Sequence, residues 1–101
     1  MNETLTKAKI LDCLKEYYTT HREIYKITSM GIFGSFAREE QHEGSDIDIV
    51  FETTEPNLLK TSSMKIELEE IFHRPVDIIR FRESLRPGFK RRIAKEAVYV
   101  R

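Results

Sequence analysis

The spacing of apolar residues changes along this 101-residue chain, and each kind of spacing predicts a different element. In the first 20 residues the apolar positions recur with helical periodicity, which predicts an amphipathic helix. A short, mainly apolar run from Ile27 to Phe33 predicts a central strand that ends at Gly34. A brief helix is expected from Phe36 to about Gln41, followed by a turn at residues 43–45.

Asp46 and Asp48 alternate with Ile47 and Ile49, and this period of two predicts a second strand from Asp46 to Glu52. Pro56 can open a helix at its first turn, and helical spacing of apolar residues extends that helix to His73. Pro75 then ends it, and a third alternating strand is expected from Val76 to Phe81. The residues expected on the apolar face of this helix are Leu58, Leu59, Ile66, Leu68, Ile71 and Phe72.

A final helix is expected to begin at Pro87 or Gly88 and to end near Ala97. The resulting order, αβαβαβα, predicts an α/β fold in which one small sheet is flanked by helices. A chain of this length is expected to form a single domain, residues 1–101, because it is too short to build a second core.

The second predicted strand carries the most informative pattern in the chain. Alternation places Asp46 and Asp48 on one face of the strand and Ile47, Ile49 and Phe51 on the other. Two carboxylates on one face repel each other, so a positive partner is expected between them, and a hard divalent cation fits that need. A pair of acids can also protect an edge strand from aggregation, but the apolar neighbours favour a central strand.

Asp77 lies near the start of the third predicted strand, just as Asp46 lies at the start of the second predicted strand. If these strands are neighbours, their backbones lie about 4.8 Å apart, and the carboxylates of Asp46, Asp48 and Asp77 converge. Such a group suits one or two Mg²⁺ ions, which can stabilise the attacking and leaving oxygens of a phosphoryl displacement. Asp46 and Asp48 would bind the metal, and Asp77 would complete the site and help to deprotonate the attacking hydroxyl. Asp77 alone could equally cap the end of its strand.

Gly34 and Ser35 fit the same chemistry. Glycine lets the backbone approach a phosphate closely, and Ser35 is expected to cap the helix that starts at Phe36. The N–H groups at that helix start favour an anion, and Arg38 could add a phosphate contact. A Gly-Ser pair before a helix is common, however, and an arginine in this position often only faces solvent.

Charge is unevenly distributed, although the formal net charge is zero. Residues 80–101 hold eight basic and two acidic residues, and the rest of the chain is correspondingly acidic. This basic segment could dock a partner or attract phosphate, or it could be a solvated helix face.

The single cysteine excludes an internal disulfide, and Cys13 lies on an apolar stripe where it is expected to be buried. The chain has no stretch apolar enough for a signal peptide or a membrane span, so a cytoplasmic location is expected.

The combination of Gly34-Ser35, ten intervening residues, Asp46-x-Asp48 and a later strand Asp77 is specific. It resembles the minimal nucleotidyltransferases of the DNA polymerase β-like superfamily, and among them the MntA-type antitoxins of HEPN/MNT toxin–antitoxin pairs. The resemblance implies a mixed sheet with flanking helices, Mg²⁺ and a nucleoside triphosphate. It also implies that the chain transfers AMP from ATP to a tyrosine hydroxyl of a helical HEPN toxin, encoded beside it.

By the same resemblance, Asp46, Asp48 and Asp77 are the metal ligands, and Gly34 and Ser35 bind the nucleotide phosphates. One departure is visible, because relatives often carry glycine where Glu39 follows Arg38. An acid at this position could weaken nucleotide binding or could point to solvent.

Two other functions remain compatible with the sequence. The chain could neutralise a HEPN protein by binding alone, although pure binding would not need all three acids. It could also transfer a nucleotide to a small molecule or to RNA, although larger relatives use an additional helical domain to hold such acceptors. Neither DNA nor a membrane is an expected partner.

Overall fold

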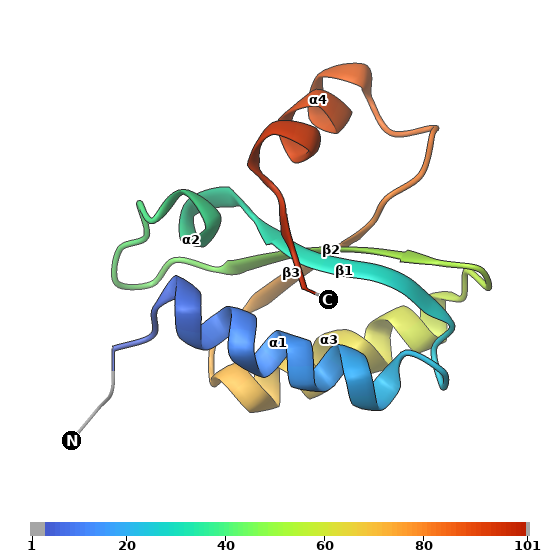
Figure 1. Cartoon of the computed structure of the whole chain (residues 1–101), viewed down its shortest axis with the longest axis horizontal. Coiled ribbons are helices and arrows are strands. Elements are labelled where there is room, and N and C mark those ends of the chain that lie inside the picture. Colours follow the sequence, from blue (N-terminus) through green and yellow to red (C-terminus); the bar gives the residue numbers. More distant parts are fainter. Residues whose placement is uncertain (1–3, 101) are drawn as a thin grey trace.

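The computed structural model describes residues 4–100, which form a four-stranded sheet with helices on both faces (Figure 1). The elements are α1 (Lys7–His21), β1 (Ile27–Phe33), α2 (Gly34–Arg38), β2 (Ile47–Thr53), α3 (Leu58–Phe72), β3 (Val76–Arg80), α4 (Pro87–Glu96) and β4 (Val98–Tyr99). The strand order is β3-β2-β1-β4. Strand β1 is antiparallel to β2 and β4, whereas β2 and β3 are parallel. The sheet is therefore mixed, and the predicted α/β fold class is confirmed.

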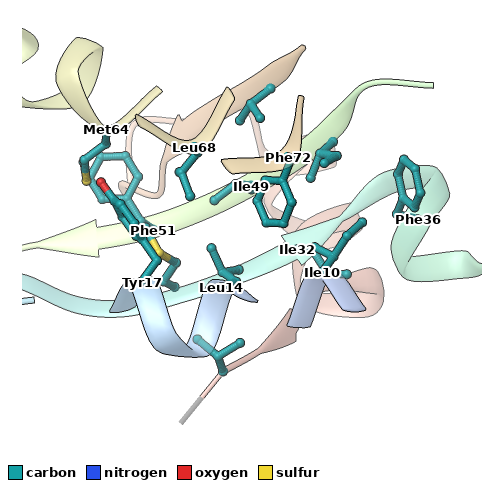
Figure 2. Packing of buried hydrophobic residues seen from close by; sticks show 14 of the residues in the cluster. Ile10, Leu14, Tyr17, Ile32, Phe36, Ile49, Phe51, Met64, Leu68 and Phe72 are labelled. Atoms are coloured by element: carbon teal, nitrogen blue, oxygen red, sulfur yellow. The ribbon is translucent and has the colours of Figure 1, made fainter. Parts of the chain in front are cut away.

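Helices α1 and α3 cover one face of the sheet and enclose the larger core (Figures 1 and 2). Alternation in β2 directs Ile47, Ile49 and Phe51 into this core, where all three are fully buried. The helices contribute stripes with a spacing of three or four residues, which are Ile10, Leu14 and Tyr17 in α1 and Met64, Leu68 and Phe72 in α3. Burial of these stripes against the sheet supplies most of the apolar stabilisation of the fold.

The opposite face carries a smaller core beneath α4. Ile93 of α4 packs with Phe33 of β1 and Val50 of β2, and Phe89 meets Phe33 edge to face at 5.9 Å between ring centroids. Asp48 precedes Val50 by two residues, so its side chain points to this same face. The α4 face therefore holds both a thin apolar layer and the carboxylates of interest.

Several predicted boundaries shift by one or two residues. Strand β2 begins at Ile47, which leaves Asp46 in the preceding loop, and β3 ends at Arg80 rather than Phe81. Helix α3 does not start at Pro56, because the side chain of Asn57 accepts a hydrogen bond from Lys60 N at 3.0 Å and caps the helix.

Strand β4 was not predicted. Its two residues pair antiparallel with Gly31 and Ile32 of β1, and a strand this short has no readable period. A Cβ atom at Gly31 would lie 2.5 Å from the carbonyl oxygen of Val98, so glycine is needed for this close approach.

Two predictions of burial were wrong. Cys13 is exposed, because it precedes the buried Leu14 and is therefore rotated about 100° away from the stripe of α1. Four of the apolar residues assigned to α3 are also exposed, because that helix packs through a different stripe; they are Leu58, Leu59, Ile66 and Ile71. Among residues 4–100, no helix is long and apolar enough to cross a membrane.

Candidate active site

Asp48 and Asp77 are direct register partners on the neighbouring parallel strands β2 and β3. Parallel strands lie about 4.8 Å apart, and partner side chains point to the same face of the sheet. Asp48 is half-buried, whereas Asp77 is exposed. The expected adjacency of the two strands is therefore present, and it brings together two carboxylates that are 29 positions apart in the sequence.

Asp46 lies in the loop before β2 and is exposed. Within the described part of the chain, no three or more His, Cys, Asp or Glu side chains are grouped closely enough to hold a metal ion by themselves. The structure thus pairs two of the three predicted acids and keeps the third nearby in the loop. Carboxylate oxygens are still the donors that Mg²⁺ prefers, and this cation usually takes its other ligands from water and substrate phosphates.

The pKa of Asp48 is raised above its ordinary value. Partial burial is the largest cause, and the neighbouring charges of Asp77 and Asp46 act in the same direction. The positive charges of Arg92 and Arg38 act against this increase. A desolvated carboxylate beside like charges gains most from a bound cation, so the electrostatics fit a divalent metal at this position.

Gly34 opens α2 immediately beside Asp48. Its φ is +75°, a left-handed conformation that favours glycine, and a Cβ atom here would overlap the carboxylate of Asp48. Ser35 is not a helix cap, because β1 runs directly into α2 and the capping position is occupied by Phe33, which makes no side-chain cap bond. Ser35 instead lies in the first turn, where backbone N–H groups have no partner within the helix.

Helix α2 ends at Arg38, earlier than expected, because Glu39 takes a left-handed conformation with φ +58°. This backbone conformation favours glycine, and Glu39 adopts it as a non-glycine residue. The Glu39 carboxylate is exposed and lies 3.8 Å from Lys7 Nζ of α1. Its nearest charge partner is therefore a lysine of α1 and not a group beside Asp48.

Arg38 contacts α4 through Glu96. Arg38 Nη1 donates to Glu96 Oε1 at 2.7 Å, and Arg92 Nε donates to Glu96 Oε2 at 3.1 Å. Burial alone would raise the pKa of Glu96, but these two hydrogen bonds bring the pKa below its ordinary value. In the sequence, Arg92 stands out only as part of the basic segment at residues 80–101, and Glu96 was not predicted to take part in the site. The one sequence feature that could have indicated the pair is the spacing of four between Arg92 and Glu96 on one helix. The same spacing is also typical of ordinary surface ion pairs.

These features define a class of protein. Two carboxylates on adjoining strands, a glycine turn in contact with one of them and nearby arginines are suited to the transfer of a phosphate-bearing group. The sequence of residues 8–100 matches the family model of the nucleotidyltransferase domain, and the chain belongs to this family. The predicted enzyme class, a nucleotidyltransferase, is thereby confirmed.

In sequence, the chain is similar to curated protein adenylyltransferases. It is 34% identical over 97 residues to the protein adenylyltransferase MntA of Thermococcus cleftensis, covering 95% of this chain and 97% of the relative. It is 36% identical over 96 residues to MJ1217 of Methanocaldococcus jannaschii, named as a candidate protein adenylyltransferase, covering 94% and 98%. The chain is therefore homologous to the MntA-type protein adenylyltransferases.

Solved structures share the fold. A candidate minimal nucleotidyltransferase superposes with a TM-score of 0.77 and 26% identity over 96% of this chain and 98% of that chain. A tri-AMPylated HEPN toxin of Shewanella oneidensis in complex with its MNT antitoxin gives a TM-score of 0.68 at 14% identity, covering 93% and 71%. The second likeness concerns the fold alone.

Proposed function

We propose that this chain transfers AMP from ATP to a hydroxyl group, that of a tyrosine, on a helical HEPN-type toxin and thereby acts as its antitoxin. The observation that carries the proposal is the register pairing of Asp48 with Asp77 on the face where Gly34 meets Asp48. The homology to protein adenylyltransferases supports a protein as acceptor.

Each predicted site residue has a role in this proposal. Asp46, Asp48 and Asp77 would hold Mg²⁺ together with phosphate oxygens of the nucleotide. The bound metal would polarise the phosphate and stabilise its developing charge. Gly34 and Ser35 would bind phosphate oxygens through the first turn of α2, and Arg38 at the end of the same helix would add a further phosphate contact.

In the transfer step, the acceptor oxygen forms a bond to the α-phosphorus. The bond from that phosphorus to the bridging oxygen breaks, and its electron pair leaves with pyrophosphate. Asp77 would take the hydroxyl proton, because it is exposed on the edge strand next to Asp48 and an acceptor can reach it.

The partner supplies what a domain of this size lacks. The described residues form one sheet with four helices and offer little wall to orient an acceptor hydroxyl above the carboxylates. Orientation of the reacting groups is among the largest contributions to catalysis, so the acceptor protein itself is expected to complete the site. The HEPN–MNT complex of the same fold supports this arrangement.

The test is incubation of the chain with Mg²⁺, ATP labelled in its α-phosphate and the helical product of the neighbouring gene. Transfer of label to a tyrosine is expected, and Asp48→Asn should reduce its rate by about 10² or more because a metal-binding charge is lost. Asp77→Asn should retain ATP binding and lose turnover.

Glu52→Gln is the matched control, because Glu52 lies on the same strand and the same sheet face but near its far end. This variant should transfer label at the normal rate. Undiminished transfer by Asp48→Asn would overturn the catalytic assignment. A stable complex without any transfer would show instead that the chain neutralises its partner by binding alone.

A further inference from the structure

A basic pocket of about 680 Å³ lies between α2, α4 and the first residue of α1. Its charged lining residues are Lys7, Arg38, Arg91, Arg92, Lys95 and Glu96. Five of these six charges are positive, so the pocket has the electrostatic character of an anion site.

The single carboxylate organises two of the cations. Glu96 is only 14% exposed, and its two oxygens accept hydrogen bonds from Arg38 at 2.7 Å and from Arg92 at 3.1 Å. One residue of α4 therefore holds a guanidinium from α2 beside a guanidinium from its own helix. Arg38 Nε also lies 3.3 Å from Glu40 Oε1. Each arginine has five N–H donors; Glu96 takes one from each and Glu40 one more from Arg38, so three donors of Arg38 and four of Arg92 remain for an anion.

This pair of arginines adjoins the transfer site. Arg38 ends the short helix whose first residue, Gly34, touches Asp48, and Glu96 holds Arg92 beside Arg38. Arg91 and Lys95 also line the pocket, but within residues 4–100 neither side chain takes part in an ion pair or hydrogen bond.

We propose that Arg92 joins Arg38 in binding the β- and γ-phosphates of the nucleotide and that Glu96 is a positioning residue which holds the two arginines for this purpose. The inference rests on the proposed function in requiring a nucleoside triphosphate, but it does not depend on the identity of the acceptor. Planar guanidinium groups bind phosphate oxygens in pairs and are suited to this ligand. When the bond to the α-phosphorus breaks, negative charge develops on the departing pyrophosphate, and the two arginines would stabilise it.

The first test compares the binding of ATP and AMP to the free chain by calorimetry in the presence of Mg²⁺. Arg92→Ala should weaken ATP binding about tenfold or more and AMP binding less than about threefold, because AMP lacks the two outer phosphates. Arg91→Ala is the matched control, since it removes the same charge from the next position of α4 without touching Glu96. It should weaken ATP binding less than about threefold.

The second test separates positioning from simple electrostatics. Removal of the negative charge of Glu96 from a basic pocket should strengthen ATP binding if charge alone matters. If Glu96 positions the arginines, Glu96→Ala should instead weaken ATP binding about fivefold or more and leave AMP binding unchanged. In a double-mutant cycle, its effect should largely disappear when Arg92 is already alanine.

Three results would overturn the inference. They are equal losses for ATP and AMP in Arg92→Ala, equal losses of ATP affinity in Arg91→Ala and Arg92→Ala, and tighter ATP binding by Glu96→Ala. If Arg92→Ala binds ATP with unchanged affinity but associates more slowly with an acidic partner protein, the pocket is a protein-docking surface and not a phosphate site. Since binding is measured without an acceptor, failure to modify a HEPN protein would count against the proposed function only. Failure of the unmodified chain to bind ATP would overturn both.

Discussion

Gly34 is the residue at which backbone conformation and chemistry are most closely linked. Its positive φ allows β1 to turn at once into α2, and its missing side chain leaves space for the carboxylate of Asp48. Gly44 also has a positive φ, of 90°, but nothing lies within 4 Å of the position a Cβ atom would occupy. A substitution at Gly44 therefore causes backbone strain alone, whereas a substitution at Gly34 causes the strain and also displaces Asp48.

Gly34→Ala should lower the rate of nucleotide transfer by about 10² or more, because the methyl group would displace the Asp48 carboxylate, to which the proposed function assigns the metal. Gly44→Ala should cost a similar backbone strain of about 1–2 kcal/mol while leaving transfer intact. Denaturant unfolding and transfer rates of both variants would check this expectation. Equal transfer rates in the two variants would mean that Asp48 can move without consequence.

At the scale of the elements, α1 and α3 are held together by partly buried hydrogen bonds as well as by apolar packing. Glu67 of α3 accepts hydrogen bonds from the hydroxyl groups of Tyr17 at 2.6 Å and Tyr25 at 2.9 Å. The ring of His21 stacks on Tyr17 with centroids 4.0 Å apart. Burial and the bond to Glu67 raise the pKa of Tyr17 well above its ordinary value, and the same causes raise the pKa of Tyr25 to about 12.

This link predicts a loss of stability in alkali. Above the ordinary tyrosine pKa of 10.0, the unfolded chain releases protons that the folded chain retains, so the stabilisation present below that pH declines as the pH rises further. A Tyr17→Phe/Tyr25→Phe variant should be less stable at neutral pH but should lose less stability between about pH 9 and about pH 12. Urea unfolding across this range is the measurement.

Tyr18→Phe is the control for this comparison, because the Tyr18 hydroxyl donates to the carbonyl of Thr28 and not to Glu67. It should show the same alkaline decline as the unmodified chain. A parallel decline in the double variant would assign the alkaline sensitivity to other groups.

For the molecule as a whole, positive charge gathers on α4 and its flanks. Helix α4 lies over the sheet face opposite to α1 and α3 (Figure 1). The structure divides the basic segment, because Lys90 pairs with Glu83 at 3.2 Å and Arg92 with Glu96, whereas Arg91 and Lys95 are exposed. Arg91 and Lys95 are therefore the better candidates to attract an acidic surface of a partner protein.

An Arg91→Ala/Lys95→Ala variant should associate with the partner at least about threefold more slowly at low ionic strength, with a smaller effect at high salt, because steering by exposed charges is screened. Lys65→Ala is the control, since Lys65 is exposed on α3 at the opposite face of the sheet. Stopped-flow association rates over a salt series would measure both. Association unchanged across the series would move the docking surface elsewhere on the domain.

The site was predicted best where its residues are close in sequence. The alternation of residues 46–49 by itself directs Asp48 to one face and Ile47 and Ile49 to the other, because the period of a strand is a local property of the backbone. Gly34 was likewise identified from its position directly after an apolar run. Two helix starts were predicted wrongly: Ser35 was expected to cap α2, and α3 was expected to start at Pro56 although Asn57 caps it. These errors are local too, since several residues near a helix start can serve as its cap.

The remaining features depend on contacts between distant parts of the chain. The pairing of Asp48 with Asp77 requires β3 to lie beside β2, and the alternation in each strand is compatible with other strand orders. The link from Arg38 to Glu96 spans 58 positions, and the pairing of β4 depends on the approach allowed at Gly31. Hydrophobic periodicity reports which face of an element is buried, not which element covers it. The sequence therefore determined the longer elements and the chemistry of their faces, while tertiary packing formed β4 and decided which of those faces meet.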